Sequence, residues 1–167
     1  MKLTSAEANK LIKQIRDEIA LIRAQEMNGY RFVAATIEDP EEVRPKYRFS
    51  ETTAEMNVRE EKIRRIKHAL NFFNASTKPD GVDMTIDELL VWLPQVRVRL
   101  SKLSDMLAEP EKERVSNSGR TSIIEYEYAN YDYDEVRREF DALTERKNKA
   151  LTALDVANNT RQFDVEI

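Results

Sequence analysis

Residues 86–107 read IDELLVWLPQVRVRLSKLSDML, and their apolar residues fall on one stripe of an α-helix. The stripe consists of Ile86, Leu89, Leu93, Val96, Leu100, Leu103 and Leu107. This spacing of alternately three and four residues keeps apolar side chains facing a neighbouring helix. Thr85 and Glu88 match a capping box at the start of the helix, and Pro94 predicts a kink within it rather than a break. The segment therefore predicts a long helix that packs against other helices.

Three further segments repeat the heptad pattern. Their stripe residues are Ala8, Ile12, Ile15, Ile19 and Ile22; Ile63, Ile66, Leu70 and Phe73; and Val136, Phe140, Leu143, Ala150, Leu154 and Ala157. With the start and stop signals between them, the predicted helices span about 4–27, 51–74, 86–108 and 133–157. Alternating patterns predict short strands at about 30–37, 121–128 and 162–167. The sequence thus predicts a single, mostly α domain over residues 1–167: an antiparallel four-helix bundle with heptad-type packing and a small β element.

The composition agrees with long solvated helices. Charged residues make up 35% of the chain and hydrophobic residues 41%, with only 3 Gly and 5 Pro. A formal charge of −4 argues against a surface built throughout for binding phosphate backbones. The absence of Cys excludes disulfides and thiolate chemistry, and no stretch is apolar enough for a signal peptide or a membrane span. We therefore expect a cytoplasmic protein with no membrane partner.

The sequence contains no recognisable catalytic, cofactor or metal motif. His68 is the single histidine, and Arg65 stands three residues before it, where a di-iron helical bundle needs Glu. The glycines at 29, 81 and 119 are too far apart to form a phosphate-binding loop. The acidic residues around position 83 lack the order of a calcium loop and are explained by a turn and a helix cap. We predict no catalytic residue, no cofactor and no metal, which favours a non-enzymatic role.

Two alternatives from other functional classes stay open. The first is a metal-assisted hydrolase, because oxygen-only ligands suit magnesium or manganese. Its candidate ligands are Glu38, Asp39, Glu41 and Glu42 in a loop, with Glu125 and Glu127. The second is a nucleic-acid accessory protein that uses the basic face of the helix at 51–74. That face carries Arg59, Lys62, Arg64, Arg65 and Lys67, interspersed with Glu55, Glu60 and Glu61. The sequence leaves open whether the acidic loop binds a divalent cation. It argues against nucleic-acid binding, because the glutamates dilute the positive charge of the basic face.

Aromatic residues gather near the third predicted strand. Four tyrosines fall at positions 126–133, and aromatic side chains with a polar tip are enriched at interfaces. Cross-strand packing within one chain is the slightly favoured alternative explanation. In an up-and-down bundle, the tail at 162–167 lies at the pole opposite the other two strands, so its backbone has no partner in its own chain. We therefore expect self-association into a dimer or larger assembly. The expected interface residues are Tyr126, Tyr128, Phe163, Val165 and Ile167.

Short motifs along most of the chain carry a family resemblance. They are MKL at 1–3, EDPEE at 38–42, MTIDEL at 84–89, YD at 133–134 and LDVANNT at 154–160. In these motifs the chain resembles the septicolysin-like family of uncharacterised bacterial proteins. The resemblance implies a bacterial protein and carries over no activity or catalytic residues. The function expected from the sequence is a homo-oligomeric structural or interaction module of a bacterial cytoplasm, with its biological role and any other protein partner unknown.

Overall fold

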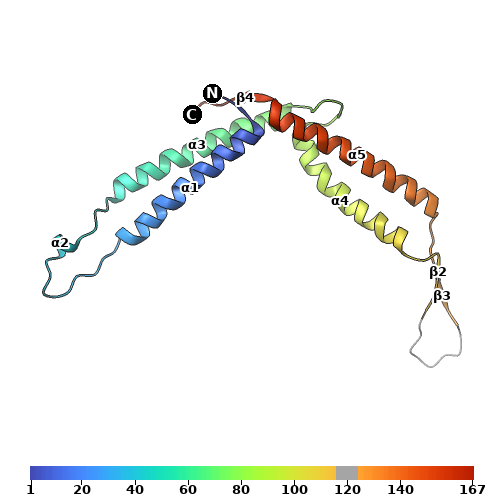
Figure 1. Ribbon diagram of the computed structural model, residues 1–167, viewed down its shortest axis with the longest axis horizontal. Coiled ribbons are helices and arrows are strands. Elements are labelled where there is room, and N and C mark those ends of the chain that lie inside the picture. The colour runs from blue at the N-terminus through green and yellow to red at the C-terminus, as the bar shows by residue number, and fades with distance from the viewer. Residues whose placement is uncertain (116–123) are drawn as a thin grey trace. The chain divides into compact units, whose positions relative to one another are not determined.

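The computed structural model describes residues 1–115 and 124–167, and helices occupy 68% of these residues (Figure 1). In chain order the elements are β1 (Lys2–Thr4), α1 (Ser5–Gly29), α2 (Pro40–Val43), α3 (Phe49–Ser76), α4 (Ile86–Ala108), β2 (Lys112–Arg114), β3 (Tyr126–Tyr128), α5 (Tyr133–Thr160) and β4 (Gln162–Asp164). The prediction of a mostly helical chain with a small β element is confirmed. The four long helices begin and end within three residues of their predicted limits.

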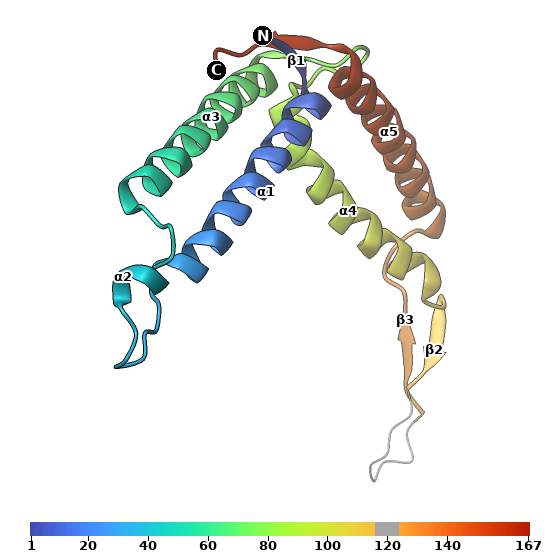
Figure 2. The ribbon, with the colours of Figure 1, turned by 60° about the vertical axis from the view of Figure 1, so that its left-hand side comes forward.

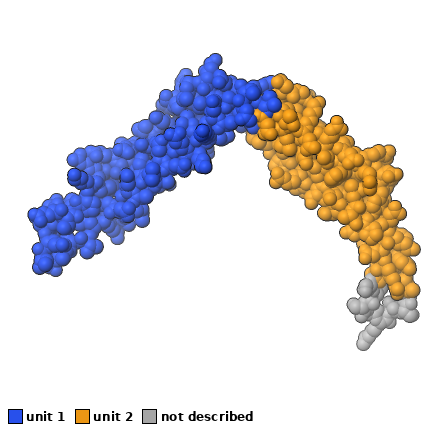
Figure 3. Space-filling model, in the orientation of Figure 1, with its two compact units in different colours: residues 1–76, 156–167 blue, residues 77–155 orange. Residues whose placement is uncertain are grey.

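The chain divides into two compact units, which Figure 3 shows in different colours. One unit comprises residues 1–76 and 156–167, and the other comprises residues 77–155. The predicted arrangement of all four long helices in a single antiparallel bundle stays a prediction, and so does the single domain. Along the described part of the chain, no helix combines the length and apolar character needed to cross a bilayer.

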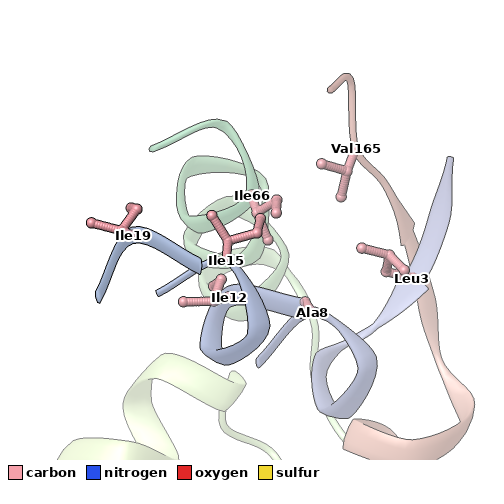
Figure 4. Close-up of a cluster of buried hydrophobic side chains, with 7 residues drawn as sticks. All are labelled: Leu3, Ala8, Ile12, Ile15, Ile19, Ile66 and Val165. Atoms are coloured by element: carbon pink, nitrogen blue, oxygen red, sulfur yellow. The ribbon is translucent and has the colours of Figure 1, made fainter. Parts of the chain in front are cut away.

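In the first unit, α1 and α3 lie side by side (Figure 2). Their order is antiparallel, because Glu26 near the end of α1 contacts Tyr47, just before α3, whereas Glu18 contacts Arg59 further along α3. The apolar stripes of the two helices meet in a buried cluster, drawn in Figure 4. The cluster consists of Leu3, Ala8, Ile12, Ile15, Ile19, Ile66 and Val165. The heptad residues predicted from the sequence therefore do form the core of this unit.

The C-terminal tail belongs to this same core. β4 pairs with β1 in antiparallel register, with Leu3 opposite Phe163, and the N-terminal amino group donates a 2.8 Å hydrogen bond to the Val165 carbonyl. Val165 is only 1% exposed, and the rings of Phe163 and Phe73 stack with centroids 5.0 Å apart. The expectation that the tail has no partner in its own chain is wrong. The sequence pattern showed the strand but not β1, its partner at the other end of the chain.

In the second unit, α4 and α5 also run antiparallel. Arg99 of α4 pairs with Glu139 of α5 at 2.8 Å. Earlier on α4, the Trp92 ring centroid lies 5.1 Å from the guanidinium of Arg146, which comes later on α5. Residue numbers therefore rise along α4 as they fall along α5. The helix α4 continues through Pro94 without a break, as predicted. The i,i+4 spacing of Glu145 and Lys149 does not produce an ion pair between these two described residues.

The strand predictions are only partly correct. Residues 30–37 form no strand, and residues 126–128 of the predicted strand at 121–128 form β3. Residues 121–123 of that prediction lie outside the described residues. The partner of β3 is β2 rather than the segment at 30–37. At 30–37 an aromatic and β-branched pattern predicted a strand, but the Phe32 ring instead packs 5.3 Å from the Arg44 guanidinium.

Two capping boxes fix the starts of α1 and α4. Thr4 and Thr85 accept hydrogen bonds from the backbone of Glu7 and Glu88, whose carboxylates accept in return from the Thr4 and Thr85 backbone N–H groups. The backbone hydrogen bond is the main cause that lowers the pKa of Glu7 and Glu88 below the ordinary value of 4.5, followed by the threonine hydroxyl. Both carboxylates therefore stabilise the helix ends in their ionised form.

This lowering predicts a dependence of stability on pH. Because the folded chain holds these two pKa values below those of the unfolded chain, the unfolded chain binds more protons on acidification. The stabilisation is complete above the ordinary carboxyl pKa and is lost as the pH falls through the lowered values. We expect the double substitution Glu7→Gln and Glu88→Gln to flatten the decline of the thermal midpoint between about pH 5 and pH 3. Circular dichroism melts at a series of pH values measure this, and a slope equal to that of the wild type contradicts it.

Candidate interaction surface

The strands β2 and β3 form a two-stranded antiparallel ribbon in the second unit, labelled in Figure 2. Glu113 lies opposite Glu127 at its centre. Beyond the strands, the Val115 N–H donates to the Glu125 carbonyl and the Ala129 N–H donates to the Glu111 carbonyl, both at 3.0 Å. We call residues 111–115 and 125–129 the ribbon. Every residue of β2 and β3 is exposed, so the ribbon covers no hydrophobic core.

One face of the ribbon is aromatic and cationic. Residues directly opposite in an antiparallel pair share a face, so Lys112 and Tyr128 lie beside Arg114 and Tyr126. The Lys112 Nζ atom is 4.1 Å from the Tyr126 ring centroid and 5.2 Å from that of Tyr128. An ammonium group at this distance is attracted by the ring quadrupole. We call these four residues the tyrosine face.

The opposite face is acidic. Alternation along the strands places the odd-numbered residues here, and these include Glu111, Glu113, Glu125 and Glu127. Like charges directly opposite each other across a strand pair are destabilising, and Glu113 and Glu127 stand in that relation. We call these four residues the acidic face.

Two tyrosines fasten the base of the ribbon to the end of α4. The Tyr131 hydroxyl donates to the Met106 carbonyl at 2.5 Å, and the Tyr133 hydroxyl donates to the Glu109 carbonyl. Their rings lie 5.2 Å apart. The hydrogen bond with Tyr131 is the main cause that raises the pKa of Tyr133 to about 12, with desolvation second. Tyr133 therefore keeps its proton, and remains a donor, well above neutral pH.

The structure separates the five expected interface residues into two groups. Tyr126 and Tyr128 are 44% and 61% exposed on one face of the ribbon. Phe163 and Val165 are used inside the first unit, where β4 pairs with β1, and Ile167 is 45% exposed beyond that strand. A position of Phe163 and Val165 in an interface conflicts with this packing, because Val165 is buried and Phe163 stacks on Phe73.

The loop carboxylates have local structural partners. Glu38 accepts a 2.7 Å hydrogen bond from the Ala35 N–H, Asp39 caps α2, and Glu41 pairs with Arg44 at 2.5 Å. Over residues 1–115 and 124–167, no three His, Asp or Glu side chains are grouped so that they could hold a metal ion. The described structure thus offers the hydrolase alternative no metal centre.

The basic residues of α3 do not form one free face. Arg59 lies toward α1 and pairs with Glu18 at 3.0 Å, and Arg65 pairs with Glu61 at 2.5 Å. Lys62, Arg64, Lys67 and His68 are exposed. Pairing within the chain therefore removes part of the cationic surface that the nucleic-acid alternative needs.

The first unit also contains an open cleft of about 980 Å³ between the end of α1, residues 41–48 and the start of α3. Its charges are of both signs, and several of them pair locally, as Arg48 does with Glu51 at 2.7 Å. Tyr47 in this cleft donates to Glu26 at 2.8 Å. Desolvation raises the pKa of Tyr47, with this hydrogen bond as the second cause. The Tyr47 phenol in this cleft is therefore protonated and hydrogen-bonded, and several of the charged groups around it are paired. None of the described residues of the cleft is arranged to activate a nucleophile.

Sequence reasoning missed Lys112, Arg114, Glu111 and Glu113 as functional candidates. It considered Glu125 and Glu127 only as candidate metal ligands. A signal for them exists, because residues 111–114 alternate in charge and residues 125–128 alternate between Glu and Tyr. Two such alternating segments on either side of the polar residues at 116–119 are typical of a hairpin. The charged character of the first segment concealed it, since Lys and Glu are depleted in strands.

Comparisons with known proteins inform the fold alone. No family model matches the chain, and no curated protein matches it. The crystal structure of a functionally unknown conserved protein from Corynebacterium diphtheriae matches with a TM-score of 0.56 and 16% sequence identity. The match covers 98% of this chain and 100% of that one. At this identity the two chains share a fold, and the likeness says nothing of what either protein does.

Proposed function

We propose that this protein is a non-enzymatic, homo-oligomeric structural or interaction module of the bacterial cytoplasm, with the ribbon as its contact surface. The observation that carries this proposal is that every residue of β2 and β3 is exposed, with Tyr126 and Tyr128 on one side. Exposed tyrosines offer apolar area with a polar tip, the character that protein interfaces favour. Ile167 stays a candidate contact, whereas Phe163 and Val165 act within the chain.

The small size of the ribbon supports the same function. A two-stranded sheet without a hydrophobic face is at best marginally stable in water. Tyr131 and Tyr133 fasten the base of the ribbon, and its exposed surface offers a neighbouring chain both aromatic rings and charges. Contact with a second copy would stabilise an element that the chain itself stabilises weakly.

Two finer parts of the proposal concern fold and family. The four-helix bundle stays part of this proposal, since antiparallel order within each helical pair is the order that an up-and-down bundle requires. The short motifs described above support membership of the septicolysin-like family. Neither part supplies a catalytic role. No contact in the described structure favours the hydrolase or nucleic-acid alternatives over self-association.

Light scattering after size-exclusion chromatography tests the proposal. We expect the wild-type protein at micromolar concentration to have the mass of two or more chains. The double substitution Tyr126→Ala and Tyr128→Ala should lower this mass, since it removes the exposed rings, and leave the helical signal unchanged. Phe72→Ala is the matched control, because Phe72 is 72% exposed on α3. A monomeric wild type refutes self-association, and an unchanged mass in the tyrosine variant refutes the ribbon as its surface.

A further inference from the structure

The two faces of the ribbon carry opposite chemistry. Lys112 and Arg114 lie on the tyrosine face, and four glutamates lie on the acidic face. The cross-strand pair of Glu113 and Glu127 makes the isolated ribbon less stable than a neutral pair would. A cationic partner laid against the acidic face would relieve this repulsion, so the arrangement favours a bound state over a free one.

A partner that binds the acidic face must carry positive charge on a surface narrow enough to lie against two exposed strands. The tyrosine face of a second copy meets this requirement, since it carries two cations on two cross-strand pairs of its own ribbon. Conversely, the acidic face supplies carboxylates to Lys112 and Arg114, for which no ion pair is found within the described chain. One ribbon thus presents both halves of a charge-complementary contact.

Pairing through the strand edges fits the residues less well. β2 and β3 are only three residues long, and β2 is charged throughout. Short, charged edge strands are a common protection against edge pairing. A symmetric antiparallel pairing of β3 with a second β3 would also place Glu127 opposite its own copy. The charges therefore direct association through the faces of the ribbon.

We propose that copies of this chain associate head to tail, with the tyrosine face of one ribbon packed on the acidic face of the next. This inference rests on the proposed self-association and specifies how it occurs. Because each copy uses two different surfaces, the contact is heterologous, and such contacts build closed rings or open chains. A symmetric dimer through the ribbon would leave either the acidic or the tyrosine face of both copies uncovered.

Charge-swap variants test this arrangement. One variant carries Glu113→Lys and Glu127→Lys, and the other carries Lys112→Glu and Arg114→Glu. Each alone should associate about tenfold more weakly or worse, since like charges then meet at every contact. An equimolar mixture should recover assembly, because each variant now complements the other. Sedimentation velocity measures both results, and raising the salt from about 0.05 to about 0.5 M should weaken the wild-type assembly.

Two controls separate this contact from effects on folding or net charge. The double substitution Asp17→Lys and Asp141→Lys changes the net charge as much as Glu113→Lys and Glu127→Lys do, but at exposed positions on α1 and α5. It should leave assembly unchanged. Glu127→Gln removes the cross-strand repulsion, so it should hold or raise the thermal midpoint while weakening assembly. If Glu127 has only a structural role, assembly will not weaken in this variant.

The outcomes distinguish this inference from the function on which it rests. A wild type that stays monomeric refutes self-association as a whole. A wild type that assembles, with both charge variants assembling equally well, refutes only the head-to-tail contact. Dissociated variants that fail to recover on mixing also refute it.

Discussion

Replacing Ile66 by alanine will lower the free energy of unfolding by about 3 kcal/mol. Ile66 has no exposed surface and belongs to the buried cluster that joins α3 to Ile12, Ile15 and Ile19 of α1. The substitution removes buried carbon atoms and leaves a cavity that two rigid helices cannot fully close. Since domains of this size are stable by about 5–15 kcal/mol, the loss is a large fraction of the total.

Urea denaturation followed by circular dichroism measures this change. The midpoint should fall while the slope stays constant, since the surface exposed on unfolding is nearly unchanged. Val58→Ala is the matched control, because Val58 is a β-branched residue of the same helix that is 55% exposed. We expect it to change stability by less than about 0.5 kcal/mol. An Ile66→Ala variant as stable as this control contradicts the packing of α3 on α1.

Deleting residues 162–167 will destabilise the first unit by about 4 kcal/mol or more. The deletion removes the buried Val165, the stacking of Phe163 on Phe73, and the hydrogen bonds that join β4 to β1. It also uncovers Leu3, which is 7% exposed in the intact chain. The burial of a valine and a stacked aromatic pair account for most of the estimate.

Thermal melts and limited proteolysis test the deletion. We expect a lower midpoint and earlier cleavage within residues 1–76, and Ile167→Ala should leave both unchanged because Ile167 is 45% exposed. If the tail served only to join copies, the deletion would reduce the mass in light scattering and leave the midpoint intact. That result would contradict the structural role of β4.

The sequence predicted the helices well because their signals are local and repeated. The stripe from Ile86 to Leu107 identified α4 to the residue, and the Thr85 and Glu88 pair marked its start. The capping box of Thr4 and Glu7 carries the same signal at α1. Heptad spacing and cap chemistry depend on residues within one or two turns, so they can be read without knowledge of the rest of the fold.

Strand pairing could not be predicted in the same way. Alternation indicated strands near Phe163 and Tyr126, but their partners are set by where the helices bring the chain ends. β2 was missed because Lys112, Glu113 and Arg114 resemble solvated loop residues. The ribbon faces depend on the register between two segments, so only the structure shows which charges share a side.

The pairing of β1 with β4 also affects the order in which the two units of the protein can fold. β1 and its partner strand are separated by nearly the whole chain, and contacts of such long sequence separation form late. Residues 77–155 are continuous and can fold without β1 or β4, whereas residues 1–76 await the pairing of these two strands. Until then Leu3 and part of the α1 stripe lack their cover and present apolar surface to chaperones. A purified chain that ends at residue 161 should therefore contain a folded second unit and a protease-sensitive first unit.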